Sequence, residues 1–96
     1  MPKRALSVVL EVFENHAAAL RNHYWHIRYM RSANRRRKHY RHAAKEKAQL
    51  VGLGYCSEVV RLYALYLRDP RREIRYKRFL QAFEESKHWP RQLTLF

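Results

Sequence analysis

The chain has 96 residues, which is enough for one small domain. Hydrophobic residues make up 47% of it and Gly and Pro are scarce, so the net charge of +13 does not indicate a disordered chain. No apolar run reaches the length of a membrane span, no secretory signal is recognisable, and a single cysteine, Cys56, cannot form an internal disulfide. We therefore expect a cytoplasmic protein without a membrane partner.

The first third of the chain carries one apolar seam at alternating spacings of four and three residues, unbroken by Gly or Pro. The seam consists of Leu6, Leu10, Phe13, Ala17, Leu20, Tyr24 and Ile27. This spacing predicts a long amphipathic helix. The seam could pack inside a bundle or against a second copy of the chain as a coiled-coil-like homodimer, and both alternatives stay open.

A second helix is predicted after Ser32, which can serve as its N-cap, and should run to about Val51. Gly52 or Gly54 can supply the positive φ that ends it. Its apolar side is thin and consists of Tyr40, Ala43, Ala44, Ala48 and Val51. We expect most of the surface of this helix to be exposed.

Two more helices complete the prediction. Ser57 is a candidate N-cap for a helix in which residues 59–67 are apolar almost all round, as expected for the buried centre of a bundle. Asp69 and Pro70 have the pattern of an N-cap followed by Pro in the first turn, and should open a last helix that ends at Trp89-Pro90. The inward-facing residues of this last helix are Tyr76, Phe79, Leu80 and Phe83.

The predicted fold class is all-α, because no run of residues alternates with period two. We expect a small bundle of about four helices, of which the first two could be continuous. Residues 1–90 are assigned to this basic helical domain, and residues 91–96 to a short extended C-terminal tail.

The positive charge is concentrated in one segment. Residues 21–48 carry +9 of the net +13, with Glu46 as their single acid. Such an excess favours a polyanion as partner, and phosphate contacts alone do not separate DNA from RNA. A membrane surface is disfavoured because the basic helix lacks a large apolar face. The residues predicted to bind nucleic acid are Arg28, Arg31, Arg35, Arg36, Arg37, Lys38, Arg41, His42 and Lys45 in this segment, and Arg71, Arg75 and Arg78 on the last helix.

Metal and cofactor sites are not predicted. His23 and His26 share a helix face and could begin a metal site, but no further Cys or paired carboxylate lies at ligand spacing. Stacked or surface histidines are the preferred interpretation. Glycine-rich phosphate loops are absent, and Cys56 is interpreted as a buried structural thiol.

The chain ends in Gln92-Leu93-Thr94-Leu95-Phe96. This pentapeptide resembles the peptide with which bacterial polymerases and mismatch-repair proteins dock on the DNA sliding clamp, the β subunit of DNA polymerase III. The resemblance implies that Leu95 and Phe96 are the anchors, Leu93 a smaller contact and the Gln92 amide an orienting hydrogen-bonding group. The alternative is that the tail folds back on the bundle as a hydrophobic lock.

A second local pattern is Arg21-Asn22 followed by His26. It resembles the signature of HEPN ribonucleases, which are small helical proteins. The resemblance implies that Arg21 binds phosphate, His26 acts as acid or base and Asn22 gives polar support. On a straight helix Arg21 and His26 point about 140° apart, so joint chemistry would need a kink or a partner chain.

The sequence therefore predicts a small, basic DNA-binding adaptor without catalytic activity. The clamp-like tail tilts the choice toward DNA and suits a phage or mobile-element factor that recruits or competes for replication or repair machinery at the nucleoid. The alternatives are a HEPN-like ribonuclease and a basic subunit of a ribonucleoprotein complex.

Overall fold

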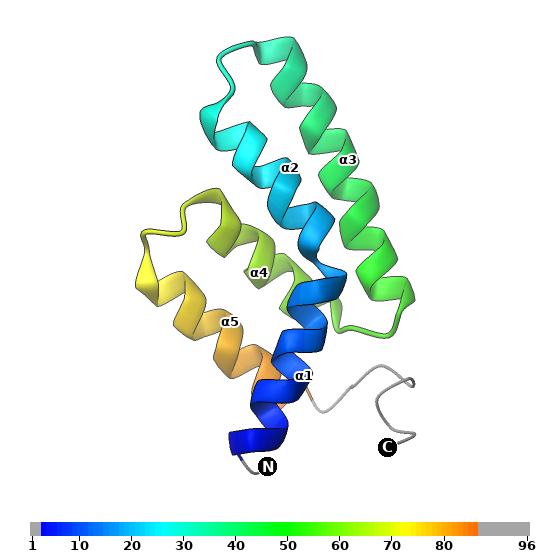
Figure 1. Cartoon of the computed structure of the whole chain (residues 1–96), viewed down its shortest axis with the longest axis vertical. Coiled ribbons are helices and arrows are strands. Elements are labelled where there is room, and N and C mark those ends of the chain that lie inside the picture. Colours follow the sequence, from blue (N-terminus) through cyan, green and yellow to red (C-terminus); the bar gives the residue numbers. More distant parts are fainter. Residues whose placement is uncertain (1–2, 87–96) are drawn as a thin grey trace.

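The computed structural model describes residues 3–86, with side chains from residue 6 onward. Within this range the chain is all-α, as predicted, and forms five helices and no strand (Figure 1). The helices are α1 (Lys3–His16), α2 (Ala18–Tyr29), α3 (Ala33–Gly52), α4 (Ser57–Arg68) and α5 (Glu73–Glu85). None of these helices is both long and apolar enough to cross a bilayer.

The predicted long first helix is bent into α1 and α2 at Ala17, which gives one helix more than expected. Ala17 has φ −90° and ψ 8°, outside the helical region, although Ala17 N still donates to Phe13 O at 2.9 Å. No Gly or Pro marks this position. The bend lets α1 lie against α5 while α2 pairs with α3 (Figure 1).

The core is aromatic and centres on Phe13, which is fully buried. Its ring lies 4.8 Å from that of Tyr55, 5.0 Å from Tyr63 and 5.4–5.5 Å from the rings of Phe83 and Phe79. Such edge-on and tilted pairs add to the stability that burial of the rings provides.

The apolar seam of the first third is used inside the chain. Its members from Phe13 to Ile27 are at most 8% exposed, and Leu6 and Leu10 pack against the core. The seam therefore packs inside the bundle, as in the first of the two alternatives. It does not offer an exposed apolar surface to a second copy of the chain.

The predicted limits of α3 are confirmed. The Ser32 side chain accepts a hydrogen bond from Arg35 N, and Gly54 has φ 108°, which only glycine adopts readily. The chain reverses between Tyr29 and Ala33, so α2 and α3 are antiparallel neighbours and not the one continuous helix that the sequence allowed (Figure 1).

Two other predicted helix starts are wrong. Ser57 is the first residue of α4, and Cys56 occupies the cap position without a side-chain hydrogen bond. Asp69 opens a turn closed by Arg72 N donating to Asp69 O at 3.1 Å, so α5 begins only at Glu73. The helix ends at Glu85, before the predicted Trp89-Pro90 stop, which lies outside the described residues together with the 91–96 tail.

Candidate nucleic-acid interface

The N-terminal half of α3 is a bare basic surface. All eight residues from 31 to 38 are exposed, and the buried residues of α3, Ala43 and Leu50, come later. Because so few apolar residues occupy this helix, it packs mainly through its C-terminal half and leaves the rest to solvent. We call the exposed cationic set the α3 basic surface; its members are Arg31, Arg35, Arg36, Arg37, Lys38, Arg41 and Lys45.

Part of the α3 basic surface forms a stripe along the helix. Arg35, Lys38, His42 and Lys45 follow one another at spacings of three and four on the unbroken α3, whereas Arg31 lies in the turn that precedes the helix. Ten residues of helix from Arg35 to Lys45 extend about 15 Å. Three cations, Arg35, Lys38 and Lys45, therefore lie in one row on a rigid helix, with His42 between them stacked on His23.

These cations have no carboxylate partners within the fold. Among residues 6–86, ion pairs join Glu58 to Arg61 at 2.6 Å and Asp69 to Arg71 and Arg72 at 3.6 and 3.3 Å, and none involves α3. The charge of the α3 basic surface is consequently uncompensated, which leaves it available to an external polyanion.

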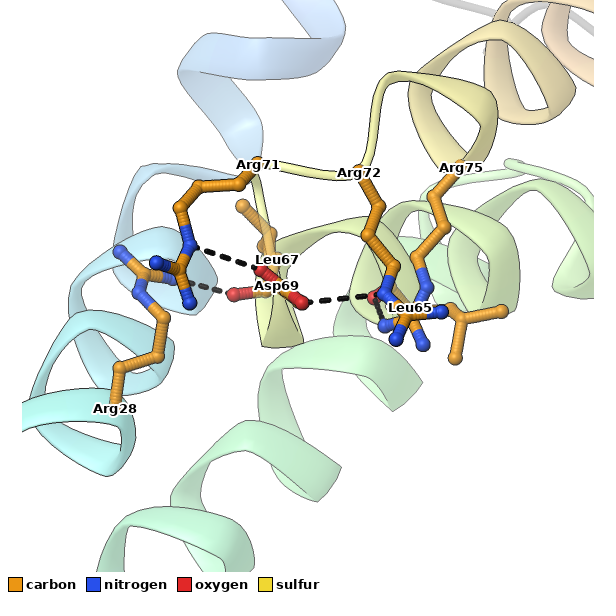
Figure 2. A network of polar contacts seen from close by, with 7 residues as sticks. All are labelled: Arg28, Leu65, Leu67, Asp69, Arg71, Arg72 and Arg75. Atoms are coloured by element: carbon orange, nitrogen blue, oxygen red, sulfur yellow. Dashed lines mark hydrogen bonds and ion pairs between the residues drawn. The ribbon is translucent and has the colours of Figure 1, made fainter.

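Other arginines predicted to bind nucleic acid are engaged at the C-terminus of α4 (Figure 2). Arg28 donates from Nη1 to the carbonyl oxygen of Leu67, and Arg75 donates from Nη1 to that of Leu65 at 2.9 Å. The last four carbonyls of a helix lack intrahelical partners and carry the negative end of the helix dipole, so cations are stabilising there. Arg28 and Arg75 therefore close α4, a contact that the sequence did not predict for either residue.

The turn after α4 holds a second group of engaged charges. Asp69 lies between Arg71 and Arg72, as Figure 2 shows. Burial alone would raise the pKa of the Asp69 carboxyl, but the charge of Arg71 and hydrogen bonds from Arg71 and Arg72 outweigh it and lower that pKa. Arg78 is exposed on α5, away from this turn.

Four histidines join α2 to α3. His23 Nδ1 and His39 Nδ1 lie 3.0 Å apart, His26 stacks on His39 at 4.6 Å between ring centroids, and His42 stacks on His23 at 5.1 Å. A contact between two Nδ1 atoms requires that one donate and the other accept, so at least one of these two rings is neutral. The stacking matches the interpretation favoured from the sequence. Residues 6–86 contain no group of three or more His, Cys, Asp or Glu arranged to hold a metal.

The same cluster lowers the basicity of two of its members, His23 and His39. Burial lowers the pKa of His23 and of His39, and the neighbouring histidines lower both further. Glu46 acts in the opposite direction on His23, and Lys38 adds to the lowering at His39. The surroundings of His23 and His39 thus favour their neutral forms.

The residues of the ribonuclease-like pattern, Arg21, Asn22 and His26, line one open cleft of about 800 Å³ between α2, α4 and α5. No partner chain is needed to bring them to one cleft, contrary to the expectation for a straight helix. Sequence reasoning missed the aromatic walls of this cleft, because they come from distant elements. They are Trp25, Tyr63, Tyr66 and Tyr76.

The remaining predicted site residues, Gln92, Leu93, Leu95 and Phe96, lie outside the described residues. No known family matches the chain, and no curated protein or solved structure is significantly similar to it.

Proposed function

We propose that this protein is a DNA-binding adaptor that holds duplex DNA through the α3 basic surface and docks on a bacterial sliding clamp through residues 92–96. The observation that carries the proposal is the run of eight exposed residues, 31–38, with five cations and no carboxylate partner. Uncompensated charge of this density costs stability through self-repulsion, and a polyanion removes that cost.

Duplex DNA suits the rigidity of this surface. Phosphates follow one another along one strand at about 3.4 Å of axial rise, so a cationic row of about 15 Å can meet several of them without reshaping the protein. Arginine forks also bind phosphate oxygens in a bidentate manner, which lysine does not. Binding through phosphates predicts little sequence preference.

The clamp half of the proposal rests on the terminal sequence Gln92-Leu93-Thr94-Leu95-Phe96. A short peptide binds well only where a few side chains fill pockets, and Leu95 and Phe96 are suited to that. Burial of each is worth about 1.5–3 kcal/mol, so loss of both should weaken clamp binding by at least about tenfold to a hundredfold.

One pair of variants tests both halves. Deletion of residues 92–96 should abolish binding to a purified clamp and leave affinity for a 20-base-pair duplex unchanged. Substitution of Arg35, Arg36, Arg37 and Lys38 by Ala should do the reverse. Calorimetry of each variant against each ligand gives the four values. Equal loss of both activities in one variant, or no clamp association of the intact chain, would contradict the proposal, as would a preference for duplex RNA.

The ribonuclease alternative has one observation in its favour, namely that Arg21, Asn22 and His26 line the same cleft. It predicts metal-independent cleavage of RNA by the purified protein and its disappearance in His26→Ala. The adaptor proposal predicts no cleavage and unchanged duplex affinity in that variant.

A further inference from the structure

We propose that the outer face of α2 is a second nucleic-acid site, which takes unpaired nucleotides by stacking their bases on Trp25 and Tyr29. This inference rests on the proposed function, because it assumes a nucleic-acid partner. It adds the structural class of that partner: a duplex that continues into a single strand.

Trp25 and Tyr29 are large aromatic residues left in solvent. They lie one helical turn apart on α2, their side chains form a pair with ring centroids 5.1 Å apart, and they are 51% and 67% exposed. The core-facing residues of the same helix, Leu20, Tyr24 and Ile27, are buried. The aromatic pair is therefore not needed to close the core, and it presents ring faces to the outside.

The pair forms a ridge among three adjoining hollows. The cleft of about 800 Å³ includes Trp25 and ends near Pro70, and a hollow of about 320 Å³ includes Trp25, Tyr29 and Arg31. A third hollow, of about 620 Å³, lies between Tyr29 and the turn at residues 68–71. A chain of nucleotides could thus stack bases on the outward faces of the two rings, as proteins that bind single strands do with aromatic platforms.

The charges around the ridge suit a phosphate backbone. The cations that line the three hollows are Arg21, Arg28, Arg31, Arg68 and Arg71. Arg28 caps α4 and Arg71 pairs with Asp69, which leaves Arg21, Arg31 and Arg68 without an ion-pair partner among residues 6–86. Two acidic residues line the hollows, and each already has a partner. Glu14 accepts a hydrogen bond from the Tyr76 hydroxyl at 3.4 Å, and Asp69 is paired with Arg71. The excess of positive charge favours a nucleic acid as the ligand. A protein that binds through ion pairs or through apolar contacts alone fits this surface less well.

The ridge is continuous with the α3 basic surface. Arg31 lines the hollow beside Tyr29 and is also the first residue of the exposed run 31–38. His26 lines the cleft and stacks on His39 of α3. A strand that leaves a duplex bound on α3 therefore meets Tyr29 and Trp25 next, which indicates a junction or overhang as the preferred ligand.

Tryptophan fluorescence tests the site directly. The sequence has two tryptophans, so in a Trp89→Phe background Trp25 is the sole emitter. Titration with a single-stranded oligothymidine should quench this emission, and a blunt duplex of the same length should quench it much less. Absence of quenching by single strands would overturn the inference.

Affinities measured on the full chain complete the test. Trp25→Ala combined with Tyr29→Ala should weaken single-strand binding by about tenfold to a hundredfold, because each substitution removes the ring on which a base stacks. Trp25→Phe combined with Tyr29→Phe should keep most of the affinity, and both variants should bind blunt duplex within twofold of wild type. Equal single-strand affinity in the Ala variant and wild type would refute the stacking site while leaving the duplex proposal intact. Conversely, the α3 substitutions could leave duplex affinity unchanged while single strands still bind. That result would refute only the duplex proposal.

Discussion

The arginines of α3 and those at the C-terminus of α4 differ in what surrounds them. At the end of α4, Arg28 and Arg75 meet backbone carbonyls of Leu67 and Leu65, and Asp69 pairs with its two arginine neighbours (Figure 2). Along the first half of α3 the cations form no ion pair with a carboxylate among residues 6–86. A count of positive residues therefore overstates the charge available to a ligand, and the local partners decide which arginines hold the fold and which are free.

The difference follows from which helix terminus lies near each set of arginines. The last carbonyls of α4 face α2 and α5, whose arginines reach them across 39 and 10 residues of sequence. The arginines of α3 instead follow its N-terminus, where the backbone offers N–H donors and no free carbonyl, and where the Ser32 side chain accepts from Arg35 N. The guanidinium groups that follow it stay in solvent.

Loss of the two capping arginines should have the largest effect on stability. Arg28→Met combined with Arg75→Met keeps much of the side-chain volume but leaves carbonyls of α4 without partners, at about 1–2 kcal/mol for each. For a domain of this size the melting temperature should fall by about 8–20 °C. Thermal unfolding followed by circular dichroism measures this. Arg71→Met is the control, since its side chain is 94% exposed, and should leave the melting temperature nearly unchanged. An unchanged melting temperature in the double variant would show that these contacts are not structural.

The histidine cluster should make the α2–α3 pair sensitive to acid. Because the pKa values of His23 and His39 are lowered in the folded chain, the unfolded chain binds more protons below pH 6.5, and stability should decrease as the pH falls from 6.5 toward the folded-state values. Melting temperatures between pH 8 and pH 5 measure the trend. His39→Asn should flatten it, and a melting temperature that rises on acidification would contradict this account.

Tyr55→Phe should have the smallest effect at neutral pH. The Tyr55 hydroxyl is buried and has no hydrogen-bond partner among residues 6–86, so its removal should leave stability equal or raise it by up to about 1 kcal/mol. Burial raises the pKa of Tyr55 to about 12 from the ordinary 10.0. Its ionisation in the unfolded chain should therefore reduce stability between pH 10 and 12, and the Phe variant should lose that part of the alkaline decline. Denaturant melts at pH 8 and pH 11 compare the two chains, and an identical decline in both would contradict the assignment.

Sequence patterns predicted what local chemistry controls. The apolar seam, the Ser32 cap, the glycine after α3 and the exposure of α3 all depend on neighbours within a few residues, and each was found. The bend at Ala17 was missed because packing of α1 against the α4–α5 pair imposes it without a local signal. The start of α5 was misplaced because Asp69 and Pro70 suit a turn as well as a helix cap.

Residue roles that depend on tertiary contacts could not be predicted from the sequence. Nothing near Arg28 shows that a helix 39 residues later ends beside it. The histidine cluster was easier to predict from the sequence. His23 and His26 are three residues apart, as are His39 and His42, and an antiparallel helix pair would bring two such pairs together. The aromatic cleft draws on α2, α4 and α5 and has no counterpart in any one segment.

The salt dependence of duplex binding tests the central contrast most directly. Arg35→Ala with Lys38→Ala and Arg71→Ala with Arg72→Ala each remove two exposed cations, the first pair from the stripe on α3 and the second from the turn after α4. Each phosphate contact contributes about 0.9 to the slope of log affinity against log salt, so the α3 pair should reduce that slope by about 1.8 and the other pair should leave it within error of wild type. Equal slopes for the two variants, or a reduction only in the Arg71 and Arg72 variant, would contradict the division between free and engaged arginines.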